Sequence, residues 1–364
     1  MKVIPHSKPT IQEDDIKAVS AVLKRCLISQ GEGVERFEKL FSKYHGIRGG
    51  VAVSSGTAAL HIALLALGIG KGDGVIVPTY ACIAPYNAVR YTGATPVLAD
   101  TVKDGWAMDA ERIEDYLKRD SKRRVRAIIV VHLFGNPVNM DAFMEISKRR
   151  SIPVIEDCAL SLGAEYKGKK VGAFGEISIF SFYATKVITT GEGGMLISNS
   201  REILDRAMDL REYDEKKDDT LRFNYKMTDF QAAMGISQLK KLPKFIEQRR
   251  RIAKNYLDKL QNLPLSLPDQ SEHTKDIYHR FVVKIKNADR FIDAMRRKGI
   301  TCKKPVFMPV HRIVERRALP NAEKIWKEAV SLPIYPSLDK DAVKRIIGCT
   351  KKIIEGMRIN VGSA

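Results

Sequence analysis

The 364-residue sequence has no apolar run of the ~18 to 20 residues that a membrane-spanning helix needs. Its first residues, MKVIPHSKPT, also lack the apolar core of a signal peptide. No segment repeats, and none is of low complexity. We therefore expect a globular cytoplasmic protein with no membrane partner.

Cysteine is scarce and scattered. The five cysteines form no CxxC pair of the kind that binds zinc or shuttles electrons, and the seven histidines are too dispersed for a ligand set. We expect no metal site and reduced, mostly buried thiols at Cys26, Cys82, Cys158, Cys302 and Cys349.

Acidic residues are outnumbered by basic ones, 43 against 62, which gives a formal charge of +19. Such a surface attracts anions such as nucleic acid, acidic lipid or a phosphorylated small molecule. The basic residues form short clusters, for example at 123–124 and 249–251, with no aromatic residues between them. This pattern is typical of solvated helix faces, so we expect no nucleic-acid partner.

Helical and extended patterns alternate in the first half of the chain. Short apolar runs predict strands, and apolar residues at helical spacing between them predict covering helices. This alternation is typical of an α/β fold with a mostly parallel sheet. The predicted strands are 75–77, 95–98, 127–131, 153–155, 177–182 and 194–197, and the predicted helices are 55–67, 84–91, 110–117 and 141–149.

A change of pattern near Pro243 predicts a domain boundary. We expect a long helix over 224–242 that Pro243 ends, and a second helix that begins near Phe245. An alternating segment at 279–285 and a helical one at 290–298 predict a smaller α+β domain. The expected division is a large domain of residues 1–243 and a small C-terminal domain of residues 244–364.

The segment VAVSSGTAALHIALLAL passes from a predicted strand into a helix through a turn of small residues that contains Gly56. Small residues let backbone N–H groups approach a ligand, and a helix N-terminus favours a phosphate. Serine and threonine before an apolar run are equally good helix caps without any ligand. Both interpretations stay open from this segment alone.

A second segment, PVIEDCALSLGA, ends a predicted buried strand with Glu156 and Asp157. Consecutive side chains of a strand point to opposite faces, so the two carboxylates face different surroundings. One of them could cap the next helix, or pair with a cationic ring nitrogen such as that of pyridoxal phosphate.

A third segment, ISIFSFYATKVITTGEGGMLIS, places Lys186 after a predicted strand and before a glycine-rich turn. Its neighbours Ala184, Val187 and Ile188 favour partial burial, which lowers the pKa of a lysine and frees the neutral amine to attack an aldehyde. A lysine that extends to solvent beside a hairpin is the alternative. The glycines match neither the GxGxxG nor the P-loop pattern.

Together these segments supply a phosphate cradle, a partner for a pyridinium and a Schiff-base lysine. The sequence resembles the DegT/StrS family of sugar aminotransferases, which are pyridoxal-phosphate enzymes of the aspartate-aminotransferase fold, called fold type I. The segments that carry the resemblance extend over nearly the whole chain: ISQGEGVERFEKLFSKYHG, SSGTAALHIALLALGIGKGDGVIVPTY, GATPVLAD, VIEDCA, FSFYATKVITTGEGGM, FNYKMTDFQAAMGISQL and LPNAEKIWKEAVSLPIYPSL.

The resemblance implies a role for each matched residue. Lys186 is expected to form the internal aldimine with pyridoxal phosphate and to move the proton, and Asp157 to pair with the ring nitrogen. Asn224 would reach the phosphate from the neighbouring subunit of a homodimer, and Lys226 stands near that shared site. The expected phosphate cradle consists of Gly56, Thr57, Ala58 and Ser181.

Two coenzyme positions depart from the family's common pattern. Cys82 stands where an aromatic residue often stacks on the coenzyme ring, so the stacking would come from elsewhere, such as Tyr80, or be replaced by a thiol contact. Leu160 occupies the position that usually holds Gln or His. We expect both to change the tuning of the coenzyme and not its attachment.

The resemblance implies transfer of an amino group from an amino-acid donor, typically glutamate, to a nucleotide-linked keto sugar. A branch of the family with His in place of the lysine dehydrates or deoxygenates sugars, and Lys186 argues against that branch. A regulator or scaffold that keeps the fold without catalysis is a further alternative, suggested by Cys82 and Leu160. For His279 and His311, a packing role and a role near the sugar site stay open.

Overall fold

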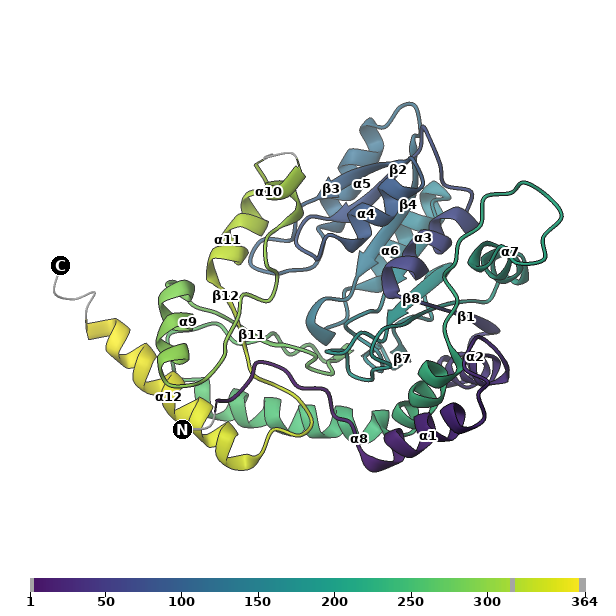
Figure 1. Cartoon of the computed structure of the whole chain (residues 1–364). Coiled ribbons are helices and arrows are strands. Elements are labelled where there is room, and N and C mark those ends of the chain that lie inside the picture. Colours follow the sequence, from purple (N-terminus) through teal and green to yellow (C-terminus); the bar gives the residue numbers. More distant parts are fainter. Residues whose placement is uncertain (1–2, 315–317, 360–364) are drawn as a thin grey trace.

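The centre of the molecule is a seven-stranded sheet (Figure 1). The structure is a computed structural model that describes residues 3–314 and 318–359. The strands are β1 (Gly49–Val53), β2 (Gly74–Pro78), β3 (Thr95–Ala99), β4 (Val125–Val131), β5 (Val154–Asp157), β8 (Ile177–Ser181) and β9 (Gly194–Ser198). Their order across the sheet is β1-β9-β8-β5-β4-β2-β3, and β9 runs antiparallel to both of its neighbours. The mostly parallel sheet predicted from the sequence is confirmed.

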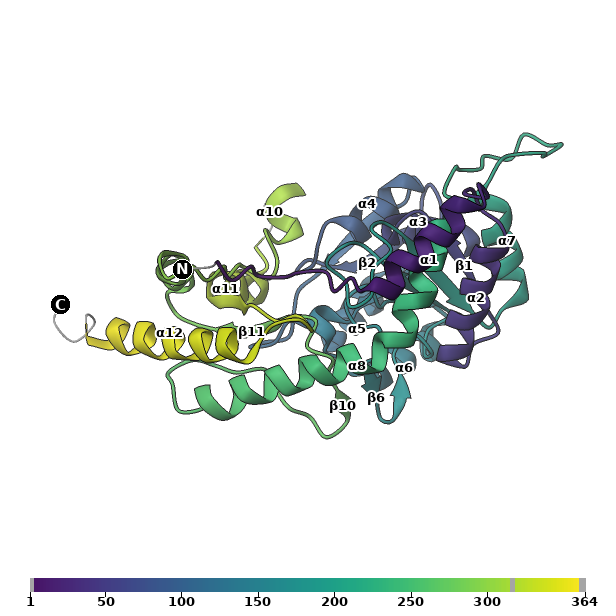
Figure 2. The same ribbon diagram turned by 60° about the horizontal axis from the view of Figure 1, so that its bottom comes forward.

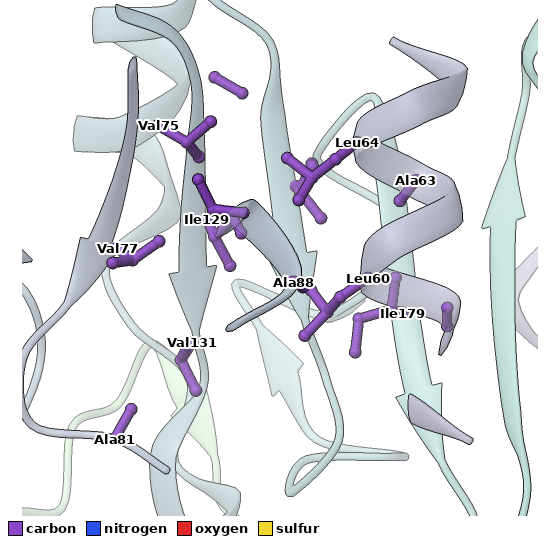
Figure 3. Close-up of a cluster of buried hydrophobic side chains, with 14 of the residues drawn as sticks. Leu60, Ala63, Leu64, Val75, Val77, Ala81, Ala88, Ile129, Val131 and Ile179 are labelled. Carbon is purple, nitrogen blue, oxygen red and sulfur yellow. The ribbon is translucent and has the colours of Figure 1, made fainter. Parts of the chain in front are cut away.

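Both faces of this sheet are buried, because alternate residues of each strand enter two separate cores. Val75 and Val77 of β2 lie in one core, and Ile76 lies in the other. Figure 3 shows Leu60 and Leu64 of α3 in the first of these cores. Helices α3 (Gly56–Ala66), α4 (Ala84–Tyr91) and α7 (Arg201–Arg211) line this core, and α2 (Glu32–His45), α5 (Ala110–Arg119) and α6 (Met140–Arg150) line the opposite one.

One long helix, α8 (Asp229–Leu260), continues through Pro243. Three predictions are therefore wrong: the helix does not begin at Asn224, Pro243 does not end it, and no second helix begins near Phe245. Proline removes one helical hydrogen bond at a cost of ~3 kcal/mol or more, but residues on both sides of it are buried. Phe245 packs in a core of the large sheet and Tyr256 in a third core. The division at 243/244 stays a prediction, because α8 crosses it unbroken.

The third core surrounds an antiparallel strand pair, β11 (Phe281–Lys284) with β12 (Ala329–Leu332). Helices α9 (Ala288–Arg297) and α12 (Lys340–Ile359) pack there, and α10 (Val310–Val314) and α11 (Pro320–Glu328) lie between this region and the large sheet (Figures 1 and 2). The predicted strand at 279–285 and helix at 290–298 correspond to β11 and α9.

The remaining elements are short or peripheral. Helix α1 (Glu13–Lys24) packs against α8, where Gln238 donates a hydrogen bond to Asp15 at 2.8 Å. A small sheet is formed by β6 (Glu165–Tyr166), β7 (Lys169–Lys170) and β10 (Thr274–Lys275), and a single 3-10 turn covers Leu133–Gly135. Within residues 3–314 and 318–359, no helix combines the length and the apolar character that a membrane crossing requires.

Candidate active site

The polar residues predicted from the three segments gather at one edge of the sheet. Asp157 ends β5 and Ser181 ends β8, and these two strands are parallel. Cys82 follows β2, which runs in the same direction. Carboxyl ends of parallel strands are where ligands bind in α/β folds, so this edge is the candidate site.

Glu156 and Asp157 point to opposite sides of β5, as predicted. The Glu156 carboxylate accepts hydrogen bonds from the backbone N–H groups of Gly172, Phe174 and Gly175 at 2.7 to 2.9 Å, and one from the Ser178 hydroxyl at 3.2 Å. Burial alone would raise the pKa of Glu156. The bonds from His132 and from the backbone outweigh burial and hold that pKa below its usual value. Glu156 therefore acts as a structural anchor.

His132 supplies another bond to this anchor, at 3.1 Å from its Nε2. Its Nδ1 accepts the backbone N–H of Val138, so the proton lies on Nε2 and is donated to Glu156. Cys158 also lies within reach of a shared metal position with these two residues. Because the ring nitrogens and the carboxylate already bind protein groups, this cluster offers no free ligand set.

Asp157 faces the candidate site. Its Oδ1 accepts a hydrogen bond from the backbone N–H of Ala159 at 3.0 Å. Within the described residues, its Oδ2 accepts none. Burial raises the pKa of Asp157, and the bond from Ala159 and the positive charge of Lys186 offset this only in part. A buried carboxylate with one free oxygen is suited to bind a cationic group.

Lys186 lies in a loop that connects β8 to β9. Two backbone hydrogen bonds close the base of this loop. The N–H of Phe182 donates to the carbonyl of Gly193 at 2.8 Å, and the N–H of Thr190 donates to the carbonyl of Phe182 at 2.9 Å. The lysine side chain is half-buried. The surrounding protein lowers its pKa, and the neighbouring Arg280 lowers it further, although Cys82 and Asp157 act in the opposite direction. The prediction of a partly buried lysine with a lowered pKa is confirmed.

Cys82 is the third member of this group. Its side chain is accessible at the surface, yet the surrounding protein and the charge of Asp157 raise the pKa of its thiol. Tyr80 does not offer a stacking face, since its ring is 0% exposed and packs edge-on against Phe134. All five cysteines are free, as expected, but only Cys158 and Cys302 are buried, so the expectation of mostly buried thiols is wrong.

The first turn of α3 approaches the end of β8. A Cβ atom on Gly56 would lie 2.8 Å from the Cβ of Ser181, so only glycine allows this contact. Ser55 caps the helix by accepting the N–H of Ala58 at 3.0 Å. The N–H of Ala58, one of the donors expected to bind the phosphate, is therefore used in capping. The N–H groups of Gly56 and Thr57 bind no described residue and remain available at a helix N-terminus.

The remaining predicted residues are Leu160, Asn224 and Lys226. Leu160 is half-buried and packs beside one sheet core. Asn224 is exposed in the segment that precedes α8, where Ser54 donates its N–H to the carbonyl of Tyr225 at 2.8 Å. Lys226 forms ion pairs with Asp214 and, at 3.9 Å, with Glu212.

The two histidines that sequence analysis left open differ. His311 is buried between the Thr79 hydroxyl at 2.7 Å and the Glu323 carboxylate at 2.9 Å, so both of its ring nitrogens are bound to protein groups, which favours the packing role. His279 is buried with neither ring nitrogen bound to a described residue. Arg280, whose charge lowers the pKa of Lys186, was not predicted from the sequence. An arginine in an alternating strand pattern gives no indication of whether it is buried or lies near a site.

Comparison with known proteins identifies the family. The model of the DegT/DnrJ/EryC1/StrS aminotransferase family matches residues 9–351. The chain belongs to this family. GDP-perosamine synthase of Escherichia coli O157:H7 is 36% identical to it over 94% of this chain and 96% of its own length. The chain is accordingly a sugar aminotransferase by family.

Solved structures agree with this membership. DesV of S. venezuelae superimposes with a TM-score of 0.92 at 31% identity, over 98% of this chain and 99% of DesV. Spr1654 of Streptococcus pneumoniae, in its PMP form, gives 0.92 at 25% identity over 99% of this chain and 100% of its own. The DegT/StrS resemblance and fold type I, both expected from the sequence, are confirmed.

Proposed function

We propose that this chain is a pyridoxal-phosphate-dependent aminotransferase that transfers an amino group from glutamate to a nucleotide-linked keto sugar. The observation that carries the proposal is the convergence of Lys186, Asp157 and Cys82, whose charges influence one another at the carboxyl edge of the sheet. The PLP and PMP forms of Spr1654 support the choice of coenzyme.

The residues present fit this coenzyme. The cradle beside Gly56 has free N–H groups of Gly56 and Thr57 and the hydroxyls of Thr57 and Ser181 for its phosphate. The free Oδ2 of Asp157 would hold the protonated ring nitrogen. When bound, pyridoxal phosphate supplies an aldehyde that accepts amino groups and a ring that withdraws electrons.

Lys186 carries out two tasks in this proposal. Its lowered pKa increases the fraction of neutral amine at neutral pH, and a neutral Nζ would be the nucleophile toward the coenzyme's aldehyde. The same Nζ would then accept and return the proton that moves between the substrate carbon and the coenzyme carbon. Asp157 keeps the nearby cation paired throughout, because its carboxylate is already oriented by Ala159.

The site is proposed to be completed by a second copy of the chain. Figures 1 and 2 show the segment between α7 and α8 projecting from the body of the molecule. It exposes large apolar side chains, with Leu221 75% and Tyr213 56% exposed, which is typical of a contact surface. Asn224 lies near the root of this segment and would reach the partner's coenzyme phosphate.

Charge supports an anionic acceptor. The formal charge of +19 raises the local concentration of a sugar linked to a diphosphate. The name of the E. coli relative specifies a GDP-linked amino sugar, so GDP-linked keto sugars are the first acceptors to test. The sugar carbon that receives the amine is part of that test.

The experiment has two stages. Purified protein with added pyridoxal phosphate is reduced with borohydride and mapped by peptide mass, with Lys186→Ala and the exposed-lysine control Lys286→Ala beside it. We expect the adduct on Lys186 in wild type and in Lys286→Ala, and none in Lys186→Ala. A panel of nucleotide-linked 3-keto and 4-keto sugars is then assayed with glutamate, with mass detection of the aminated product.

Three outcomes would overturn the proposal. Protein that stays colourless with added coenzyme would indicate a regulator or scaffold that keeps the fold. An adduct on another side chain would remove Lys186 from the mechanism. A dehydrated, unaminated sugar product would instead place the chain with the dehydratases.

A further inference from the structure

Arg280 is a cation close to the candidate site that has no acidic partner among the described residues. It precedes β11, and its backbone N–H donates to the carbonyl of Phe134 at 3.0 Å. Phe134 follows β4, which pairs with the strand of Asp157, so Arg280 is anchored at the same edge of the sheet. Within the described residues, no carboxylate forms an ion pair with its half-buried guanidinium.

The guanidinium is held in place by His6. Nη1 of Arg280 donates to Nδ1 of His6 at 2.8 Å, and Nε2 of His6 lies 2.8 Å from the Ser331 hydroxyl. Nδ1 accepts, so the ring proton lies on Nε2 and is donated to Ser331. Burial, with the charges of Arg280 and Lys303, lowers the pKa of His6 to about 3. The ring therefore stays neutral and does not compensate the arginine charge.

Three separate parts of the chain build this arrangement. His6 arrives on the N-terminal segment, which is fixed where Ile4 exchanges backbone bonds with Gly299 and Thr301 at 2.9 and 3.0 Å. Arg280 lies at the start of β11, and Ser331 belongs to β12. A guanidinium fixed by three segments has lost its rotamer freedom before any ligand arrives, which favours binding.

The surroundings of Arg280 are positive. Lys186 and the buried Arg249 lie near it, and among the described residues Arg249 binds only the backbone carbonyls of residues 278, 279 and 334, each at 3.2 Å. His279 is buried next to it with both ring nitrogens unbound. Burial lowers the pKa of Arg280 to about 10, as expected for a cation without a counter-ion.

One edge of the Arg280 fork is free. Nη1 binds His6, whereas Nε and Nη2 bind no described residue and are not sealed from solvent. A planar guanidinium with a free edge is the side chain best suited to bind an oxyanion through two parallel hydrogen bonds.

We propose that Arg280, positioned by His6, is the subsite for a carboxylate of the amino donor. This inference rests on the proposed function. In an amino acid the α-carboxylate is bonded to the carbon that carries the reacting nitrogen, so its counter-ion belongs beside Lys186. The diphosphate of the acceptor is separated from the keto carbon by part of the sugar ring, and so fits this position less well.

The experiment compares the two anions on the coenzyme-loaded enzyme. Wild type, Arg280→Gln, Arg280→Lys and the exposed control Arg290→Gln are measured in the donor half-reaction, by loss of visible absorbance at increasing glutamate concentration. Calorimetry with glutarate, an unreactive dicarboxylate, and with inorganic pyrophosphate gives binding without turnover. His6→Leu tests the positioning residue by the same measurements.

We expect Arg280→Gln to raise the glutamate KM and to weaken glutarate binding by about 10- to 100-fold, with pyrophosphate binding unchanged. Arg280→Lys keeps the charge without the fork and should recover part of this loss. His6→Leu should raise the glutamate KM by less than Arg280→Gln, with pyrophosphate binding unchanged. Arg290→Gln should match wild type.

Other results overturn the inference. An unchanged glutamate KM in Arg280→Gln removes Arg280 from donor binding, and a loss of pyrophosphate binding alone assigns it to the acceptor phosphate. If Arg280→Gln loses both anions and its coenzyme absorbance, its role is structural. Failure of the proposed function itself is visible separately, because wild type would then show no glutamate-dependent loss of absorbance.

Discussion

The carboxylate of Asp229 accepts a hydrogen bond from the backbone N–H of Gly33 at 3.1 Å, across 196 positions of sequence. The N–H groups of Gly31 and Val34 donate to the same carboxylate at 2.9 and 3.0 Å. Asp229, the first residue of α8, therefore caps α2. A Cβ on Gly33 would lie 2.8 Å from the Asp229 Cγ, so the glycine is required for this contact.

Removal of this cap should destabilise the fold. We expect Asp229→Ala to lower the free energy of unfolding by about 2–4 kcal/mol, because three helix N–H groups lose a charged acceptor. Asp229→Asn keeps an acceptor and should lose about half as much. Urea unfolding measures both, with Asp205→Ala as a control, since that exposed pair with Arg201 contributes less than about 1 kcal/mol. Equal losses in Asp229→Ala and the control would contradict the capping role.

The close contact between Gly194 and Ser55 should be equally sensitive to substitution. A Cβ there would lie 2.3 Å from the carbonyl oxygen of Ser55, at the turn that begins α3. We expect Gly194→Ala to lower the free energy of unfolding by about 1–3 kcal/mol and to weaken coenzyme retention, because the cradle must shift. Gly348→Ala is the matched control, since a Cβ there meets nothing within 4 Å and should stabilise α12 by about 0.5–1 kcal/mol. Both are read from urea midpoints and from absorbance after dialysis.

Asp157 should be needed for turnover and not for coenzyme attachment. Asp157→Asn removes a negative charge that raises the pKa of Lys186, so the pH midpoint for adduct formation should move to lower pH. Transamination should fall by about 10²- to 10⁴-fold, because the ring cation loses its counter-ion. Stopped-flow absorbance across pH measures the first effect, and product mass the second. Full turnover in Asp157→Asn would refute the assigned role.

Stability should fall in mild acid because of His45. The ring is buried and Phe41 accepts its Nδ1–H at 3.0 Å; burial lowers the pKa of His45 to about 4, despite this bond. The folded state therefore binds its proton less readily than the unfolded state, whose pKa is about 6.5. The neutral ring of His45 therefore contributes fully to the free energy of unfolding above about pH 6.5. This contribution, up to about 3 kcal/mol, is lost as the pH falls toward 4.

The test of this contribution compares pH slopes. In His45→Phe, the unfolding free energy should depend less on pH between 7 and 4.5 than in wild type. The exposed His273→Gln should leave the slope as it is. An unchanged slope in His45→Phe would show that other groups cause the loss.

Local patterns predicted most elements well, because each depends on residues close in sequence. Strands 75–77 and 127–131 and helix 84–91 correspond to β2, β4 and α4. Pro243 does not end α8, since the cost of a proline in a long helix can be outweighed by packing against distant segments, which a local pattern does not contain.

The sequence by itself determined the family, the alternating α/β pattern and the three reactive segments, because motif spacing and hydrophobic periodicity are local. Only the tertiary structure decided that Asp157, Cys82 and Lys186 lie close enough for their charges to influence one another, that Asp229 caps α2, and that His6 holds Arg280. Those relationships join residues far apart along the chain, and the burial that shifts their pKa values exists only after the strands and helices have packed together.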